Sequence, residues 1–125
     1  MEFRSRIVAT GSYLPTEIIY NQDFHQHQFY NSEGHLNPKP TVAIVNKMTE
    51  ISGIEQRRYA KTEFVTSDLC LWAAQDALES GNIDGESLDY IIVAHNFGDV
   101  NRNTLQTDML PNMASRVKAR LGTHN

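Results

Sequence analysis

The only cysteine in this sequence, Cys70, is the first residue to consider for chemistry. A thiolate is a strong nucleophile, and a histidine, a cation or a helix N-terminus favours its formation. The Thr-Ser-Asp run at 66–68 offers N-cap oxygens and a first-turn carboxylate, so residues 69–80 are expected to form a helix with Cys70 in its first turns. A face of small residues follows at helical spacing, here called the small-residue face: Cys70, Ala73, Ala74, Ala77 and Gly81. We therefore expect Cys70 to be an inert packing residue.

Three histidines, His25, His27 and His35, are candidate metal ligands. Tetrahedral metal sites need defined spacings, but no two of these histidines form an i,i+4 pair. No further cysteine or histidine completes a ligand set with them. The sequence therefore predicts solvent-facing histidines and no metal site.

Polar and basic residues elsewhere leave alternatives open. His95 and Asn96 follow an apolar run directly, where α/β proteins gather binding groups, but ordinary loop polarity fits equally well. Arg57 and Arg58 are expected to make surface ion pairs rather than to hold an anionic ligand. Three cations lie near the end of the last predicted helix: Arg116, Lys118 and Arg120. Because cations complement the helix dipole there, a solvated face is favoured over phosphate binding.

The elements that must position these residues begin with a buried helix and a buried strand. Residues 69–80 are apolar on most sides, and Gly81 offers a left-handed stop. Residues 90–94 form a continuous β-branched run, which is typical of a strand covered on both faces of a parallel sheet. Residues 4–10 predict a further strand that ends at Gly11. The pattern indicates an α/β fold.

Shorter elements surround this unit. We expect, in order, an extended piece over 16–20, a helix over 21–29 capped by Asn21, a loop over 31–40, a helix over 41–52 ended by Gly53, a strand over 54–60, a polar loop over 95–106, and a last helix that begins near 109–111 and ends at Gly122.

Length, charge and hydropathy limit the function classes. At 125 residues the chain is one domain or a piece of a larger protein. A net charge of −4 with interspersed signs argues against binding to duplex nucleic acid, which needs a basic surface. The apolar run at 7–9 is too short for a signal sequence or a membrane span, and one cysteine excludes an internal disulfide. We expect a cytoplasmic protein with no membrane partner.

Five sequence blocks occur in a recognisable order. They are Arg4-Ser5-Arg6-Ile7-Val8-Ala9-Thr10-Gly11-Ser12-Tyr13-Leu14-Pro15, Gly53-Ile54-Glu55-Gln56-Arg57-Arg58, Thr66-Ser67-Asp68-Leu69, Tyr90-Ile91-Ile92-Val93-Ala94 and Ala119-Arg120-Leu121-Gly122. Together they cover almost the whole chain and resemble the N-terminal part of the 3-oxoacyl-acyl-carrier-protein synthase III family. That family has the thiolase fold, with two similar α/β halves packed in five layers. The resemblance implies an α/β, thiolase-like fold of which only the N-terminal half is present, with an incomplete mixed sheet and packed helices.

The resemblance also implies which parts are missing. In the family the nucleophilic cysteine follows shortly after the Ala-Arg-Leu-Gly block, and the catalytic histidine and asparagine lie in the second half. Cys70 does not match the nucleophile, and His95 with Asn96 does not match the catalytic pair. Residues 1–125 would then be a fragment of the N-terminal thiolase-like domain that ends before the catalytic cysteine. The helix at 67–81 would lie in the central layer, with its small-residue face more exposed, or covered by another chain, than its composition suggests.

The function implied by the resemblance is that of the parent protein. Such an acyltransferase loads an acyl group onto cysteine and condenses it with malonyl-acyl-carrier-protein, in fatty-acid or related lipid or polyketide synthesis. The fragment itself is expected to be inactive. The resemblance implies acyl carrier protein as a partner, a homodimer of the full-length protein, acyl-CoA or acyl-ACP as substrates, and no permanently bound cofactor.

Substrate-binding residues are implied in the same way. The family's typical coenzyme A entrance carries a tryptophan and an arginine that clasp the adenine, whereas this chain has Lys47 and Ile51 at those positions. Ser52 matches a family threonine at this entrance, and Leu110 matches the residue that reaches across the dimer to line the partner's acyl tunnel. The missing clasp argues against a simple acetyl-CoA primer. The insert at 26–40 and the segment 96–100 resemble a divergent branch of the family that handles longer acyl groups.

One alternative comes from a different class of protein. The chain could be a stand-alone thiolase-like binding or structural domain that has no catalytic activity. Such a domain would have to cover the apolar sheet and helix faces that meet the second half in the family.

Overall fold

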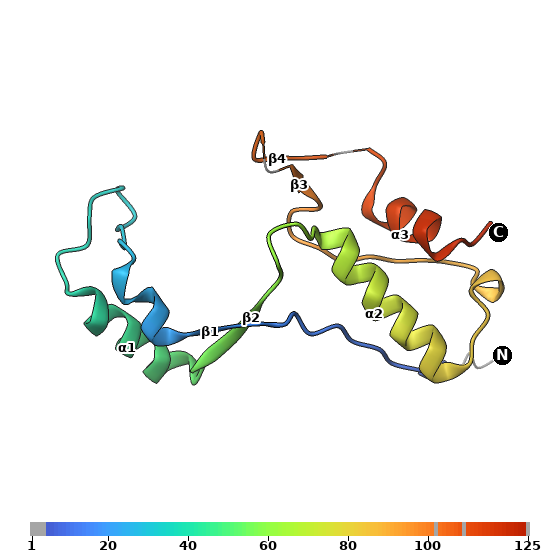
Figure 1. Ribbon diagram of the computed structural model, residues 1–125, viewed down its shortest axis with the longest axis horizontal. Coiled ribbons are helices and arrows are strands. Elements are labelled where there is room, and N and C mark those ends of the chain that lie inside the picture. Colours follow the sequence, from blue (N-terminus) through green and yellow to red (C-terminus); the bar gives the residue numbers. More distant parts are fainter. Residues whose placement is uncertain (1–4, 102, 109, 125) are drawn as a thin grey trace. The chain divides into compact units, whose positions relative to one another are not determined.

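The computed structural model describes residues 5–101, 103–108 and 110–124 (Figure 1). The chain divides into two compact units. Residues 15–61 form the first, here called the small unit, and residues 1–14 together with 62–125 form the second, the large unit. Each unit has its own helices and its own antiparallel strand pair.

The small unit pairs two strands with two helices. Its elements are β1 (Glu17–Tyr20), the 3₁₀-helix η1 (Asn21–Gln26), α1 (Thr41–Ser52) and β2 (Gln56–Tyr59). β1 and β2 are antiparallel, with Ile18 opposite Arg58. α1 packs against η1 and buries Val45, and Gly53 ends α1 with a φ of 68°. The extended piece predicted over 16–20, the helix predicted over 41–52 and the strand predicted over 54–60 are confirmed.

The helix expected from Asn21 is shorter than predicted, and its cap is a different residue. It is a single 3₁₀ segment whose N-cap is Tyr20, and the Asp23 carboxylate accepts from the Tyr20 backbone N–H at 2.8 Å. The side chain of Asn21 turns away from the cap and donates to Thr49 Oγ1 at 2.6 Å and to the Ile54 carbonyl at 2.7 Å. Asn21 therefore ties η1 to the end of α1, so its predicted capping role is wrong.

The large unit is organised around α2 (Thr66–Gly81), which packs against α3 (Met113–Leu121). Leu71, Met113 and Val117 form the buried core between these helices. Ala, Leu and Glu favour the helical state in α2, and its apolar residues supply the buried contacts. A short 3₁₀ turn, η2 (Gly85–Ser87), follows α2. Within the described ranges, no helix combines the length and apolar character that crossing a membrane requires.

An aromatic cluster sits against α2. The ring of Trp72 lies 4.5 Å from that of Tyr13 and 4.8 Å from that of Phe64, measured between centroids, and the Phe64 contact is edge-on. Offset and edge-on ring pairs are the favourable arrangements for aromatic side chains. The cluster holds the chain entering α2 and the end of the N-terminal segment against the same helix.

A carboxylate from a later segment caps the N-terminus of α2. The hydroxyls of Thr66 and Ser67 were expected to accept from the first-turn N–H groups, but Thr66 Oγ1 donates to the Gly98 carbonyl and Ser67 Oγ donates to Asp99 Oδ2, both at 2.7 Å. Asp99 Oδ1 accepts from the Ser67 backbone N–H at 2.7 Å. A carboxylate at this end of a helix is stabilised by the dipole. The predicted helix is confirmed, but the predicted capping by the 66 and 67 side chains is wrong.

Two glycines let the chain approach α2 closely. A Cβ on Gly11 would lie 2.2 Å from the Ala77 backbone nitrogen, and one on Gly81 would lie 2.7 Å from the Ala9 Cβ. The N-terminal segment therefore rests directly on the small-residue face, whose five residues are half-buried. Gly81 is the last residue of α2 rather than its stop, because Asn82 takes the left-handed conformation with a φ of 48°.

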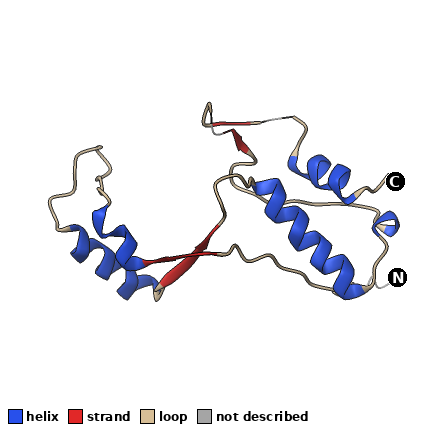
Figure 2. Ribbon diagram, viewed as in Figure 1, coloured by secondary structure: helices blue, strands red, loops and turns tan. Residues whose placement is uncertain are grey.

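Two segments expected to be buried strands are not strands. No ladder hydrogen bond joins residues 5–10 or 90–94 to a neighbour in the described part of the chain, and both are drawn as loop in Figure 2. Arg4, the first residue of that prediction, lies outside the described residues. The exposed fractions of Ile7, Tyr90 and Ile92 are 85%, 86% and 91%. β-branched residues favour a strand only when neighbouring strands accept their backbone groups and cover their side chains, so these two predictions are wrong for this chain.

The strand pairs that the described residues form are antiparallel. β3 (Val100–Asn101) pairs with β4 (Gln106–Thr107) in a region expected to be loop. The parallel sheet predicted from the apolar run at 90–94 is therefore absent from the described residues, while the mixture of helices and strands is confirmed.

Candidate functional site

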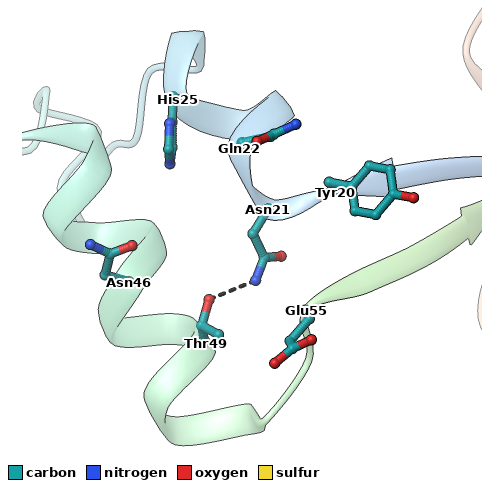
Figure 3. A pocket seen from close by; sticks show the side chains of 7 residues that line it. All are labelled: Tyr20, Asn21, Gln22, His25, Asn46, Thr49 and Glu55. Carbon is teal, nitrogen blue, oxygen red and sulfur yellow. Dashed lines mark hydrogen bonds between the residues drawn. The ribbon is translucent and has the colours of Figure 1, made fainter.

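The small unit holds an open hollow of about 690 Å³ between η1, α1 and the start of β2 (Figure 3). Seven residues line it: Tyr20, Asn21, Gln22, His25, Asn46, Thr49 and Glu55. The bond from Asn21 to Thr49 crosses between η1 and α1 and is the dashed line in Figure 3. The hollow therefore owes its shape to the same contact that joins these two helices.

Several polar groups in this hollow remain available to a ligand. The side chains of Gln22, His25, Asn46 and Glu55 make no hydrogen bond to other described residues. Carboxamides and an imidazole can donate and accept hydrogen bonds, and a carboxylate can accept them, but an open, wet hollow gives each bond little net strength. Among the described residues no group of three acidic, cysteine or histidine side chains could hold a metal ion.

The predicted histidine environments are largely confirmed. His27 and His35 are exposed; His27 stacks on Phe24 with centroids 5.0 Å apart, and His35 lies 3.5 Å from Glu33. His25 is half-buried at the edge of the hollow. The three histidines therefore form no common site.

A smaller hollow of about 190 Å³ lies beside the first and is more apolar. It is lined by Asn21, Phe24, Phe29, Val45, Met48, Thr49, Arg57 and Tyr59. The Arg57 guanidinium stacks over the Phe24 ring at 4.8 Å and donates to Asn21 Oδ1 at 3.0 Å. Cation–π stacking suits the weakly hydrated guanidinium. The surface ion pair expected for Arg57 is wrong, because Arg57 makes these internal contacts instead.

Ser52 lies at the C-terminal end of α1. Its hydroxyl donates to the Met48 carbonyl at 2.7 Å and accepts from the Ile54 backbone N–H at 3.2 Å, so it links the last turn of the helix to the following chain. Lys47, on another face of α1, pairs with Glu50 at 3.0 Å, and Ile51 is 76% exposed. None of Lys47, Ile51 and Ser52 lines either hollow of the small unit.

Leu110 belongs to the large unit, whereas Ser52 belongs to the small unit. Leu110 precedes α3 and is 83% exposed, and the Leu110-Pro111 peptide bond is cis. Its backbone carbonyl, however, is held by the side chain of Arg116 in the first half of α3, at 3.4 Å. An exposed side chain thus projects from an anchored backbone.

Arg116 is the centre of a network that the sequence did not reveal. Its Nη1 donates to Asp99 Oδ2 at 3.3 Å, its Nη2 to Asp108 Oδ2 at 3.1 Å and its Nε to the Pro111 carbonyl at 2.8 Å. The side chain is only 22% exposed, and that of Asp99 is 7% exposed. The solvated face expected for this helix is therefore wrong for Arg116. Arg120, too, is paired, with Asp68 on α2 at 2.7 Å.

Cys70 and the 95–96 pair behave as ordinary structural residues. Cys70 is half-buried, and burial, followed by the negative charge of Asp99, raises the pKa of its thiol. A raised pKa disfavours the nucleophilic thiolate, in agreement with the expected inert cysteine. His95 and Asn96 are exposed loop residues beside Gly98. The side chain of neither residue makes a hydrogen bond or an ion pair with another described residue.

Comparison with known sequences finds a relative that matches almost the whole of this chain. No family model matches the chain. Over 119 residues, 95% of this chain, it is 35% identical to the beta-ketoacyl-[acyl-carrier-protein] synthase III of Caldanaerobacter subterraneus subsp. tengcongensis. The chain spans only about 30% of that relative's length.

Solved structures of related enzymes have a similar fold. The fold is similar to the synthase III enzymes of Thermus thermophilus (30% identity, TM-score 0.66, 95% of this chain and 30% of that one) and Pseudomonas aeruginosa (26%, 0.65, 94% and 29%). The priming β-ketosynthase of the R1128 polyketide pathway shares the fold at 20% identity, with a TM-score of 0.68 over 96% of this chain and 30% of that one. The resemblance predicted from the sequence blocks is thereby confirmed: the chain has a thiolase-like fold and is similar in sequence to part of the 3-oxoacyl-[acyl-carrier-protein] synthase III enzymes.

Proposed function

We propose that this chain is part of a 3-oxoacyl-acyl-carrier-protein synthase III-type ketosynthase. The supporting observation is the 35% identity that runs through 95% of the chain, together with folds of the same family over the same span. Because the chain spans about 30% of those relatives, the activity belongs to the protein of which it is part.

The reaction joins two acyl groups in two steps. A cysteine thiolate attacks the thioester carbonyl of an acyl-CoA or acyl-ACP, forms the acyl-enzyme and releases the carrier thiol. Malonyl-ACP then loses CO₂, and the resulting carbanion attacks the acyl-enzyme to give 3-oxoacyl-ACP and free cysteine. Covalent catalysis divides the carbon–carbon bond formation, and a histidine and an asparagine stabilise the oxyanion. In this proposal none of these catalytic residues lies within residues 1–125, and the isolated chain is inactive.

The chain's own residues contribute to substrate binding. Ser52 lies at the coenzyme A entrance and Leu110 lines the acyl path of a partner subunit in a homodimer. Lys47 and Ile51 stand where an adenine clasp would need an aromatic ring and a guanidinium, so the donor is held by other groups. The protein acts in the cytoplasm with acyl carrier protein, and it has no permanently bound cofactor.

Intact-mass measurement of the complete gene product and of the isolated 125-residue chain tests this function. Each is incubated with acetyl-CoA, octanoyl-CoA and malonyl-ACP. We expect an acyl adduct and a 3-oxoacyl-ACP product from the complete protein, and neither from the isolated chain. The matched variant Cys70→Ala in the complete protein should retain acylation.

Two results would contradict the proposal. An acyl adduct on Cys70 accompanied by condensation would show that the isolated chain is catalytic. A complete gene product that takes up no acyl group would favour the non-catalytic binding or structural domain instead.

A further inference from the structure

Arg116 joins three separate parts of the large unit. It donates to Asp99 on the loop that caps α2, to Asp108 just after β4, and to the carbonyls of Leu110 and Pro111 just before α3. Its three guanidinium nitrogens all take part. Arginine can bind several acceptors at once because its guanidinium is a planar fork of five N–H donors.

The orientation of that fork is itself fixed. Asp99 is 5% exposed and accepts from the backbone N–H and the hydroxyl of Ser67, both at 2.7 Å, so its carboxylate cannot rotate freely. Bonds between ionised partners in a partly buried site are stronger than neutral ones. Asp99 therefore fixes the orientation of the Arg116 guanidinium. The guanidinium in turn binds the Asp108 carboxylate and the Pro111 carbonyl.

Leu110 contrasts with this anchored backbone. Its side chain is 83% exposed, although the carbonyl oxygen of the same residue and that of Pro111 are both bound by Arg116. Ordering the backbone of an exposed loop costs conformational entropy, which the Arg116 bonds offset. The result is that the apolar side chain of Leu110 is presented outward at a fixed position.

We infer that Arg116 is a positioning residue that sets acyl-chain selectivity by holding the Leu110 backbone. This inference rests on the proposed ketosynthase function, in which Leu110 lines the acyl path. Arg116 itself touches no substrate. A displaced wall residue changes how well the acyl path discriminates between short and long chains, because discrimination in an apolar pocket depends on the contact made with each methylene.

The test uses the complete gene product and the ratio of kcat/KM for octanoyl-CoA to that for acetyl-CoA. Leu110→Ala should change this ratio directly. Arg116→Met, which keeps the apolar stem but loses every donor, should move the ratio in the same direction by about fivefold or more. Arg116→Lys keeps the charge without the fork and should give an intermediate ratio. Arg120→Met, on the same helix but paired with Asp68, should leave the ratio unchanged.

A second variant guards against loss of folding, since Arg116→Met leaves Asp99 without its cation. Asp108→Ala removes only the half-exposed outer contact of Arg116 and keeps the Asp99 pair. It should shift the ratio in the same direction by a smaller factor. Hydrogen exchange supplies a readout that does not require activity: the Asp108 amide, which donates to the Asp99 carbonyl at 3.1 Å, should exchange faster in Arg116→Met and Asp108→Ala but not in Arg120→Met.

The outcomes separate the two proposals. Unchanged exchange would overturn the positioning role whatever the activity. Faster exchange with an equal loss of kcat/KM for both thioesters would reduce Arg116 to a structural residue and overturn its role in selectivity. If the wild-type protein uses neither thioester, the proposed function fails and the selectivity role with it, while the exchange result still decides whether Arg116 holds the segment.

Discussion

The side chain of Asn21, at the start of η1, connects three parts of the small unit by hydrogen bonds. Its carboxamide nitrogen bonds to Thr49 and to the Ile54 carbonyl, and its oxygen accepts from Arg57. One residue therefore links η1, α1 and β2 through three hydrogen bonds. Because this side chain is half-buried, water cannot replace all of those bonds when it is removed.

We expect Asn21→Ala to lower the free energy of unfolding by about 1–3 kcal/mol, since the partners in α1 and β2 lose their bonds. Urea unfolding followed by far-UV circular dichroism measures the change. Asn46→Ala is the matched control, because Asn46 is exposed in the same hollow and makes no side-chain bond to other described residues; it should change stability by less than about 0.5 kcal/mol. Equal effects of the two substitutions would show that the Asn21 bonds contribute nothing.

A second prediction for a single residue concerns the pKa of the Cys70 thiol. Burial and then the charge of Asp99 raise its pKa in the folded protein, so the neutral thiol is favoured there. The associated stabilisation is fully present below the pKa of the unfolded chain and is lost as the pH rises through the folded pKa. Alkylation by iodoacetamide, followed by mass spectrometry, should show a pH midpoint above that of an unfolded cysteine peptide.

Asp99→Asn should lower that midpoint toward the ordinary value, because it removes the neighbouring negative charge and leaves the burial. The absence of other cysteines makes the modification specific to this residue. A midpoint below that of the peptide would mean that Cys70 is an activated nucleophile, contrary to its packing role.

The roles of some of these residues can be predicted from the sequence and those of others cannot, for a physical reason. Cys70 was predicted as inert from its helical spacing alone, which is a local property. Asp99 and Arg116 are far apart in the sequence from the partners that define their roles, and only folding brings them to the start of α2. A single charged residue in a polar loop gives no periodic signal, so the network around Arg116 could not be found from the sequence.

At the scale of elements, close packing on α2 depends on Gly11. A methyl group there would meet backbone atoms of α2 at 2.2 Å and 2.5 Å, and backbone atoms cannot move aside as a flexible side chain can. Overpacking of this kind forces backbone shifts that cost about 1–3 kcal/mol.

Gly11→Ala should therefore lower the free energy of unfolding by about that amount. Ser12→Ala is the control: Ser12 is exposed, and its hydrogen bond to the Asp76 carboxylate uses the backbone N–H, which the substitution keeps. Urea titrations of both variants measure the difference. A Gly11→Ala protein as stable as the wild type would mean that the N-terminal segment does not rest on the small-residue face.

The elements differ in how well the sequence predicts them. α1 and α2 follow from periodicity, and Gly53 and Gly122 end their helices with positive φ as expected. A helix satisfies its backbone groups internally, so local sequence is enough. A strand depends on a neighbour, and the runs at 5–10 and 90–94 lack one among the described residues. Their composition was identified correctly, but composition alone could not supply the ladder.

At the scale of the whole molecule, the chain has the thiolase-like fold of part of a longer enzyme. Several of its large apolar side chains are exposed. Ile7 and Ile92 are among the most exposed apolar side chains of the large unit. Exposed β-branched segments are prone to pair with other chains. The family resemblance is visible in five short blocks because each block is a contiguous stretch of sequence. The division into two units depends instead on contacts between residues that are distant in sequence, and the sequence alone does not show it.

The aromatic cluster on α2 has a spectroscopic consequence. Trp72 is the only tryptophan, and its neighbours Tyr13 and Phe64 belong to the large unit, so selectively excited tryptophan emission reports on that unit alone. Circular dichroism reports on the helices of both units. If the units unfold independently, the two signals will give different urea midpoints, and Asn21→Ala will shift the dichroism curve while the emission curve stays in place. Coincident curves would instead mean that the two units unfold as one cooperative body.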